Sequence, residues 1–433
     1  MSQGAALGHT QRIRIIDIIR GVAVLGIFTM NAADMAYPEH LVLDFHAADP
    51  GGGWNYQVAF ISELLFSGKM RGLFTLLFGV SSVLVFQRIT LNSGGKSAVH
   101  CYFRRLCWLL IFGLVNAYIL LWWGDVLFKY ALLGMLLFPA RLAPNRFLLA
   151  GVLACLAALT VPLLLEYRDM SKLERRYMDI TGGQHSLQSL SSDENETLLK
   201  WRDVQADAEP DQEWIEEEIQ AKSGNYAGIF AYNLIITIEE QTSVFYEEDI
   251  WDMLLYMLLG IILLRADFFS DRVSRNIHLT IALSGVGRGL GIHLWLNLGV
   301  YANFLNPVRS LYYLAFYDLG RIPFVLGYAS MIILIFRLEI SRRVGDWMQA
   351  AGRMALSNYL MQSVIGALVF YGFGLAQFNS MSRLELAAFV FLVCIFQLTF
   401  SVIWMKRFHY GPAEWLWRSL TYWKLQPLRR TVT

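Results

Sequence analysis

Ten apolar runs, each close to the length needed to cross a lipid bilayer, constrain the fold of this chain more than any other sequence feature. A transmembrane helix needs about 20 mostly apolar residues, because the hydrocarbon core of a bilayer is about 30 Å thick. The runs at 126–140 and 250–265 are short for this role. The chain is therefore predicted to be an all-α polytopic membrane protein with about ten transmembrane helices. The ten runs cover residues 13–33, 68–88, 106–123, 126–140, 147–165, 250–265, 276–299, 311–336, 354–376 and 384–405.

The composition agrees with a chain that is surrounded by lipid. Apolar residues make up 56% of the sequence and charged residues 16%, whereas soluble proteins carry about 25% charged residues. The 13 tryptophans are typical of aromatic belts at membrane interfaces. Four cysteines without a CxxC pair predict neither a disulfide framework nor a metal site. The bilayer is thus an expected partner, and nothing in the sequence indicates nucleic acid.

The distribution of positive charge predicts the orientation in the membrane. Arg12 and Arg14 precede the first run, the 34–55 loop carries four acidic residues and no basic residue, and the 88–105 loop is basic again. This alternation continues along the chain, and lysine and arginine favour cytoplasmic loops. Both termini are therefore predicted to face the cytoplasm.

An acidic stretch divides the chain between the fifth and sixth runs. Residues 166–249 contain 20 acidic and 7 basic residues and are predicted to form an external, mostly helical insertion. The apolar run 226–238 inside it has 13 residues and predicts a packed or interfacial helix, not a span. Both a solvated cap and a substrate-selecting lid fit this insertion. The predicted parts are an N-terminal membrane bundle (1–165), the insertion (166–249), a C-terminal membrane bundle (250–406) and a basic-aromatic interfacial tail (407–433).

Polar residues inside the runs mark candidate sites, because ionisable groups are costly within a bilayer. Asp17 and Arg20 lie three residues apart and hence on one helix face. Several polar residues fall at one outer depth on at least three helices. Asp125 and Lys129 could be no more than a local ion pair, but single pairings explain the whole group less well than a site does. The group consists of Asn31, Asp34, Lys69, Arg71, Asp125 and Lys129.

Five ordered motifs resemble those of one protein family. They read DIIRGVAVLGIFTMN at 17–31, KMRGLFTLLFG at 69–79, WGDVLFKYALLG at 123–134, GRMALSNYLMQS at 352–363 and FHYGPAEWLWRSLTY at 408–422. The chain resembles the YeiB family of bacterial inner-membrane proteins over nearly its whole length, apart from roughly 167–225. This resemblance implies a multi-pass protein of the bacterial inner membrane.

The YeiB family is similar to a wider set of transmembrane acyltransferases that includes the heparan glucosaminide N-acetyltransferases. That relation implies transfer of an acyl group from cytosolic acyl-CoA, with an acetyl or longer chain, to a small-molecule, glycan or lipid acceptor on the outer side. Asn31 would polarise the thioester carbonyl. The catalytic histidine of the glucosaminide enzymes aligns with Val42 here, so His40 or His46 is expected to be the base and Asp125 to orient it.

The resemblance assigns further residues to the donor and to the acceptor. Basic residues expected to hold acyl-CoA are Arg12, Arg14, Arg20, Arg104, Arg105 and Arg353. Residues expected to bind the acceptor are Asp34, Lys69, Arg71 and Lys129. No metal is expected.

Two other functions stay open at this stage. One is a transporter or exporter of a small anionic or lipidic solute, with Arg288, Asp318 and Arg321 as its midplane site. The other is a non-catalytic lipid-binding or assembly protein that uses the acidic insertion as its docking surface. A homodimer is compatible with all three functions.

Overall fold

The computed structural model describes residues 2–45, 49, 51–93, 95–182, 191–208, 212–302, 306–338 and 342–430 of the 433-residue chain. This part of the chain is mainly helical and contains no β-sheet. The first ten elements are α1 (Ser2–Ala36), α2 (Glu39–Val42), α4 (Trp54–Phe66), α5 (Lys69–Ser93), α6 (Gly95–Leu114), the π-helical turn η1 (Val115–Ile119), α7 (Leu127–Leu136), α8 (Asn145–Gly182), α9 (Ser192–Ala208) and α10 (Gln212–Lys222). The others are α11 (Tyr226–Gln241), the π-helical turn η3 (Phe245–Asp249), α12 (Ile250–Arg265), α13 (Arg275–Ala302), α14 (Pro307–Leu314), α15 (Tyr317–Phe336), α16 (Arg342–Arg353), α17 (Ala355–Phe370), α18 (Arg383–Arg407) and α19 (Pro412–Tyr422).

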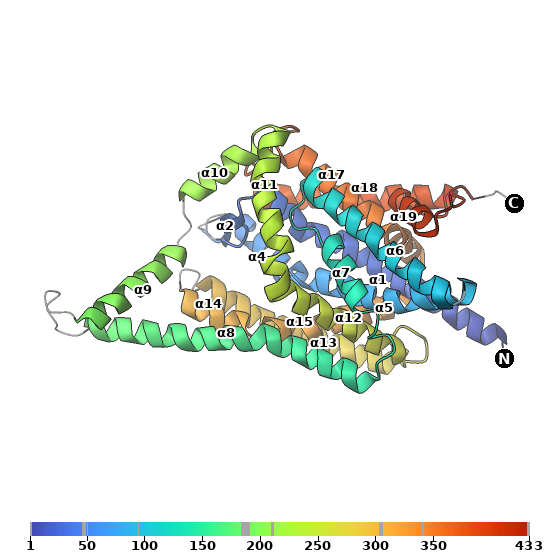
Figure 1. Ribbon diagram of the computed structural model, residues 1–433, viewed down its shortest axis with the longest axis horizontal. Helices are drawn as coiled ribbons and strands as arrows, with labels where there is room; N and C mark the ends of the chain where they lie inside the picture. The colour runs from blue at the N-terminus through green and yellow to red at the C-terminus, as the bar shows by residue number, and fades with distance from the viewer. Residues whose placement is uncertain are drawn as a thin grey trace.

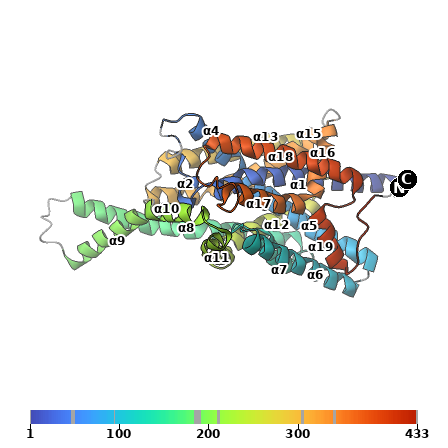
Figure 2. The same cartoon turned by 90° about the horizontal axis from the view of Figure 1, so that it is seen from above.

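Most of the long helices run side by side in one elongated bundle, and both chain termini lie at the same end of it (Figures 1 and 2). Seven helical stretches of the described chain are long and apolar enough to cross a membrane. This confirms the prediction of an all-α polytopic membrane protein. The seven stretches are Arg14–Ala36, Trp54–Leu91, Ser97–Ile119, Asn145–Gly182, Arg275–Val300, Tyr317–Phe336 and Arg383–Arg407.

Three of the ten predicted spans are occupied by helices that are too short to cross a bilayer alone. The helices α7, α12 and α17 contain 10, 16 and 16 residues, and a complete span needs about 20. Residues at the start of α7 and of α17 line a cavity inside the bundle. An interrupted helix is tolerated at membrane depth where its freed backbone groups are buried in protein or line a cavity.

The insertion is helical in its described part and projects from the bundle. The outer half of α8 and the following α9 form a hairpin beyond the end that is opposite to the termini (Figure 1). Tyr177 of α8 stacks on Trp201 of α9 with 5.5 Å between ring centroids. Helix α11 runs across the bundle and is seen end-on in Figure 2. This agrees with the prediction that the apolar run 226–238 is a packed helix and not a further span.

Two glycines allow α1 and α16 to cross with their backbones in contact. A Cβ atom on Gly21 would collide with the carbonyl of Met348, and a Cβ atom on Gly352 would collide with the carbonyl of Asp17. Small residues permit this kind of close approach between membrane helices. The crossing brings Arg353, the last residue of α16, next to the middle of α1.

The C-terminal tail folds back onto the bundle through α19. The indole of Trp417 donates a hydrogen bond of 2.8 Å to the carbonyl of Arg105 on α6, and the indole of Trp415 donates one of 2.8 Å to the carbonyl of Gln426. Trp417 also lines a cavity inside the bundle. The position of the tail at the membrane interface stays a prediction.

Candidate functional site

One cavity in the bundle lies among α1, α5, α6, α7, α16, α17 and α19, and we call it the Arg20 cavity. Its volume is about 240 Å³, and its walls are mainly apolar side chains such as Val24, Phe78 and Leu109. Three arginines, Arg20, Arg105 and Arg353, line it. The structure therefore brings together three of the six basic residues that were assigned to acyl-CoA.

Each arginine of the Arg20 cavity is held by a different partner. Arg20 donates to the Asp17 carboxylate and to the Ser81 hydroxyl, both at 2.8 Å. The guanidinium of Arg105 lies 3.4 Å from the ring centroid of Trp417, and Arg353 donates to the carbonyl of His409 at 2.9 Å. Only Arg20 among the three is neutralised by a salt bridge in the described chain. The cavity is thus apolar along most of its walls, and its lining carries three arginines and one carboxylate, that of Glu414.

The second cavity, which we call the Asn31 cavity, lies among α1, α2, α5, α7, α10 and α11 and has a volume of about 380 Å³. Asn31 and Asp34 reach it from one face of α1, since they lie three residues apart. No described residue forms a hydrogen bond with either side chain. The other charged residues that line this cavity are Glu39, Glu63, Arg71, Glu218 and Lys222.

The two cavities are neighbours that share part of their walls. Ile27, Val126 and Tyr130 line both of them. Arg20 and Asn31 are eleven residues apart on the continuous helix α1, which separates them by about 16 Å along its axis. The arginine-lined cavity therefore lies toward the termini end of α1, and the Asn31 cavity lies toward its other end. Ile27, Val126 and Tyr130 form the partition between them.

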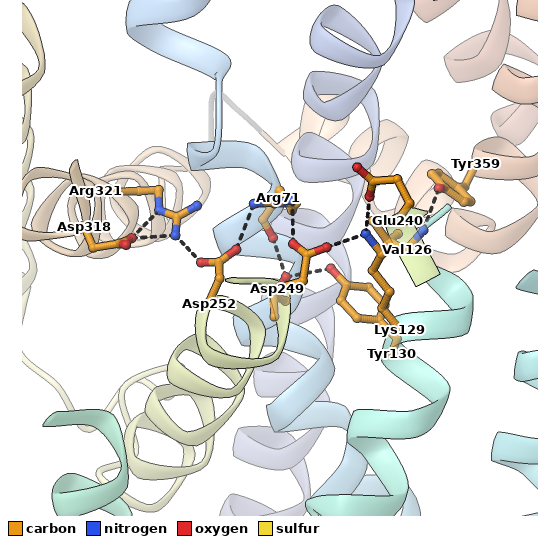
Figure 3. Close-up of polar contacts among 11 residues, drawn as sticks. Arg71, Val126, Lys129, Tyr130, Glu240, Asp249, Asp252, Asp318, Arg321 and Tyr359 are labelled. Atoms are coloured by element: carbon orange, nitrogen blue, oxygen red, sulfur yellow. Dashed lines mark hydrogen bonds and ion pairs between the residues drawn. The ribbon is translucent and has the colours of Figure 1, made fainter. Parts of the chain in front are cut away.

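A buried network of charged side chains supports the Asn31 cavity (Figure 3). Arg71 of α5 donates to Asp249 at 3.2 Å and to Asp252 at 2.9 Å. Asp252 also accepts from Arg321 of α15, which donates to Asp318 at 2.9 Å. Buried charges are tolerated only when they are paired in this way. The pairs hold η3 and α12 against α5 and α15.

The same network continues to the insertion. Lys129 of α7 donates to Asp249, and also to Glu240 of α11 at 2.6 Å. The Tyr130 hydroxyl forms a hydrogen bond of 2.6 Å with Thr75, which donates to the carbonyl of Arg71 at 2.8 Å. The network therefore connects the partition, the Asn31 cavity and α11 into one polar unit.

Comparison with known proteins gives a family. The chain is 30% identical over 425 residues to the uncharacterized protein YeiB of Escherichia coli (strain K12), a match that covers 94% of this chain and 95% of that protein. The chain belongs to the YeiB family. It is also 27% identical over 425 residues to the uncharacterized protein YxaH of Bacillus subtilis (strain 168), covering 97% and 96% of the two chains. Residues 263–424 match a family described as "Protein of unknown function (DUF418)". No solved structure matches.

Several residues that were predicted to act in this YeiB-family chain lie away from both cavities. Asp125 accepts hydrogen bonds of 2.8 Å from the Asn116 amide and from the backbone NH of Phe128, so it caps α7. It makes no salt bridge with Lys129 in the described structure. Lys69 is fully buried and donates to the carbonyl of Glu63 at 3.1 Å. Neither Asp125 nor Lys69 lines the Arg20 cavity or the Asn31 cavity.

Of the two predicted histidine bases, only His40 lies within the described residues, and it does not reach the Asn31 cavity. His40 lies on α2 with its ring 6.1 Å from that of Trp214, and it is absent from the lining of the Asn31 cavity. His46 lies outside the described residues, and so does the side chain of Arg12. The imidazole role assigned to His40 is therefore not supported by the geometry.

The remaining predicted residues of the YeiB-family chain are held elsewhere. Arg14 forms an ion pair of 2.9 Å with Asp346, and Arg104 donates to the carbonyl of Thr421. The alternative midplane trio does not assemble: Arg321 is buried, whereas Arg288 is exposed on α13. The trio was grouped by depth alone, and depth does not specify which face of a helix a residue occupies.

Other residues of the site were missed by sequence reasoning. Asp249 ends the predicted insertion and Asp252 lies near the start of the next apolar run, and neither was assigned to a site. Their spacing of three residues nevertheless places both on one helix face. Tyr130 was quoted only within a motif. Neither Glu63 nor Lys222 could be recognised as a site residue from the sequence, because each lies in a segment whose packing against α1 is not visible there.

Proposed function

We propose that this chain transfers an acyl group from acyl-CoA to an acceptor across the membrane, with the donor in the Arg20 cavity and the acceptor in the Asn31 cavity. The observation that carries the proposal is the contact between two cavities of different chemistry. One is apolar with three arginines, the other is lined by an amide and carboxylates, and Ile27, Val126 and Tyr130 separate them. Two substrates that enter from opposite sides would meet at this partition.

The residues of the Arg20 cavity suit an acyl-CoA donor. Arginine binds phosphate through charge-assisted hydrogen bonds, and Arg105 and Arg353 have no carboxylate partner among the described residues. The apolar side chains that line this cavity, such as Val24 and Leu109, suit the thioester arm and its acyl chain. Arg20, which Asp17 already neutralises, is suited to hydrogen bonding along the arm more than to binding phosphate.

The chemistry at the partition follows from the groups on α1. A nucleophilic nitrogen or oxygen of the acceptor attacks the thioester carbonyl carbon. The carbon–sulfur bond breaks as the new carbon–nitrogen or carbon–oxygen bond forms, and CoA leaves as a thiolate that takes a proton from solvent. Asn31 is positioned to donate its amide NH to the developing oxyanion. Asp34, one helical turn further along the same face, accepts the proton that the acceptor loses.

The proposed location is the bacterial inner membrane, with both termini in the cytoplasm. The termini lie together at the end of α1 nearer the Arg20 cavity. Basic loop residues such as Arg88, Arg141 and Arg146 favour a cytoplasmic position for the loops that carry them. This orientation gives the Arg20 cavity access to cytosolic acyl-CoA.

The test is calorimetric titration of the purified full-length protein in lipid nanodiscs with acetyl-CoA and with longer acyl-CoAs. We expect binding that weakens as salt rises, because exposed phosphate contacts are screened. Arg105→Gln and Arg20→Ala should each weaken binding about tenfold, the loss expected for one charged hydrogen bond. Asn31→Ala should leave binding within about twofold but reduce transfer at least 100-fold, in the range seen when an oxyanion donor is removed.

Arg14→Ala is the matched control, since Arg14 is basic but pairs with Asp346 outside both cavities. It should leave donor binding unchanged. A wild-type protein that binds no acyl-CoA of any chain length would overturn the proposal. An Asn31→Ala variant that transfers acyl groups at the wild-type rate would remove Asn31 from the reaction.

A further inference from the structure

The charges around the Asn31 cavity do not balance. Four carboxylates line it, from Asp34, Glu39, Glu63 and Glu218, together with two cations. Both cations are already paired. The Arg71 guanidinium bonds to Asp249 and Asp252, and the Lys222 ammonium bonds to Glu218. Asp34, Glu39 and Glu63 therefore face the cavity without a salt-bridge partner in the described chain.

Glu63 adds an independent observation. Only 7% of its surface is exposed, and its Oε2 atom has no hydrogen-bond partner among the described residues. The nearby Lys69 ammonium donates to the backbone carbonyl of Glu63 and not to its carboxylate. A buried carboxylate oxygen without a donor carries an uncompensated desolvation cost. A ligand that brings a hydrogen-bond donor with positive charge would remove that cost.

The arrangement of the carboxylates selects an organic cation over a metal ion. No group of three or more histidine, cysteine, aspartate or glutamate side chains is close enough to hold a metal within the described ranges. The carboxylates instead line a cavity of about 380 Å³, which has room for an organic molecule. A protonated amine provides both the positive charge and several NH donors.

We propose that the Asn31 cavity binds a protonated amine or diamine, and that this amine is the acyl acceptor. The identification of the amine as acceptor rests on the proposed function, whereas its binding does not. Asp34 and Glu63 hold the ammonium group, and Asp34 takes one of its protons, so that the neutral nitrogen attacks the thioester carbon. The carbon–nitrogen bond forms, the carbon–sulfur bond breaks, and CoA leaves as a thiolate. The nitrogen gives its second proton to solvent, from which the thiolate is protonated, and the product is an amide. Acylation removes the positive charge of the nitrogen that reacts, so the product is held less strongly by the carboxylates and leaves.

The experiment measures binding of 1,4-diaminobutane to the full-length protein in phosphatidylcholine nanodiscs, whose lipid has no net charge. Its neutral analogue 1,4-butanediol is the matched ligand. We expect the diamine to bind with an affinity that falls as salt rises, and the diol to bind at least tenfold more weakly. Asp34→Asn and Glu63→Gln should each weaken diamine binding at least tenfold.

Asp346→Asn is the control variant, because Asp346 is an exposed carboxylate that pairs with Arg14 away from the cavity. It should leave diamine binding unchanged. Equal affinity for diamine and diol, or no diamine binding, would overturn the proposal. So would full diamine affinity in Asp34→Asn, a variant of a partly exposed residue that is expected to fold even if Glu63→Gln does not.

Acetyl-CoA titration of the same nanodiscs separates this inference from the proposed function. Diamine binding without acyl-CoA binding would support the proposed amine site and contradict the proposed acyl transfer. Acyl-CoA binding without diamine binding would keep the donor cavity and reject the amine acceptor. Both bindings, followed by formation of N-acetyl-1,4-diaminobutane, would support the two proposals together.

Discussion

Tyr130 shows how one side chain connects the cavities to the polar network. Its ring lines both cavities and stacks on Phe78 with 4.9 Å between centroids. Because Thr75 donates its own proton to the carbonyl of Arg71, the Tyr130 hydroxyl is the donor in its bond with Thr75. The ring is therefore held in a fixed position between the two cavities. Its orientation depends on Thr75, which also bonds to the carbonyl of Arg71.

Truncation of Tyr130 should join the two cavities. We expect Tyr130→Ala to lower acyl transfer at least tenfold and to raise hydrolysis of acyl-CoA, because an open partition admits water to the thioester. Tyr130→Phe keeps the ring and should retain most transfer, with a stability loss of about 1 kcal/mol for the missing hydrogen bond. Release of free CoA with and without acceptor measures both rates. Unchanged hydrolysis in Tyr130→Ala would argue against Tyr130 as a partition.

Lys129 is a buried lysine that binds two carboxylates, so its charge should contribute to stability. We expect Lys129→Met to destabilise the protein by about 3 kcal/mol or more, because Asp249 and Glu240 lose their shared cation. Lys200→Met is the control, as the exposed pair of Lys200 and Glu196 on α9 should contribute less than about 1 kcal/mol. Unfolding in nanodiscs, followed by tryptophan fluorescence, compares the two variants.

At the scale of elements, a carboxylate from the tail caps a helix of the bundle. Glu414 of α19 accepts hydrogen bonds from the backbone NH groups of Leu356 at 2.7 Å and of Ser357 at 3.1 Å, and from the Ser357 hydroxyl. These NH groups belong to the first turn of α17, where no partner exists within the helix. The carboxylate also benefits from the positive end of the helix dipole. Docking of the tail therefore completes both α17 and the wall of the Arg20 cavity.

Removal of this cap should loosen α19. Glu414→Ala is expected to cost about 1 kcal/mol and to speed proteolysis of the tail in inside-out vesicles. Burial raises the pKa of Glu414, so the folded protein holds the proton more tightly than the unfolded chain does. The contribution of Glu414 protonation to the free energy of unfolding is complete at low pH. It is lost as the pH rises from about 4.3 through the raised pKa. Glu414→Gln should remove that pH dependence, which thermal unfolding at several pH values would measure.

At the scale of the whole molecule, the chain has two distinct ends. The termini and α19 lie at one end of the bundle, and the α8–α9 hairpin extends beyond the other (Figures 1 and 2). The two cavities follow one another along this direction, because Arg20 precedes Asn31 on α1. An elongated molecule with different chemistry at each end is suited to a reaction between compartments, whatever the acceptor.

The orientation is testable by cysteine labelling. After the exposed native Cys107 is replaced, a cysteine at Ser191 should react with a membrane-impermeant reagent on intact cells, whereas one at Ser97 should react only after lysis. The reason is the positive charge of the loop around Ser97. Both positions are exposed in the structure, so accessibility to the reagent reports the side of the membrane. The reverse labelling pattern would contradict a cytoplasmic N-terminus.

The sequence alone determined the membrane class and most of the helices. Apolar run length is a local property, and the solvent that surrounds a helix acts on it directly. For this reason α1 could be recognised as a helix that carries both Arg20 and Asn31. The acidic, helical insertion and the packed helix α11 were also recognisable from local composition.

Only the tertiary structure decided which polar groups meet. Asp125 and Arg71 were both predicted to belong to one site, yet one caps α7 and the other lines the Asn31 cavity, because the packing that positions them is not displayed by one sequence. The first turn of α17 is capped by Glu414, which is 58 residues from Leu356 in the sequence. Likewise, Glu63 lacks a salt bridge because Arg71 and Lys222 pair with other carboxylates. The balance of charge within a cavity depends on how the whole bundle is assembled.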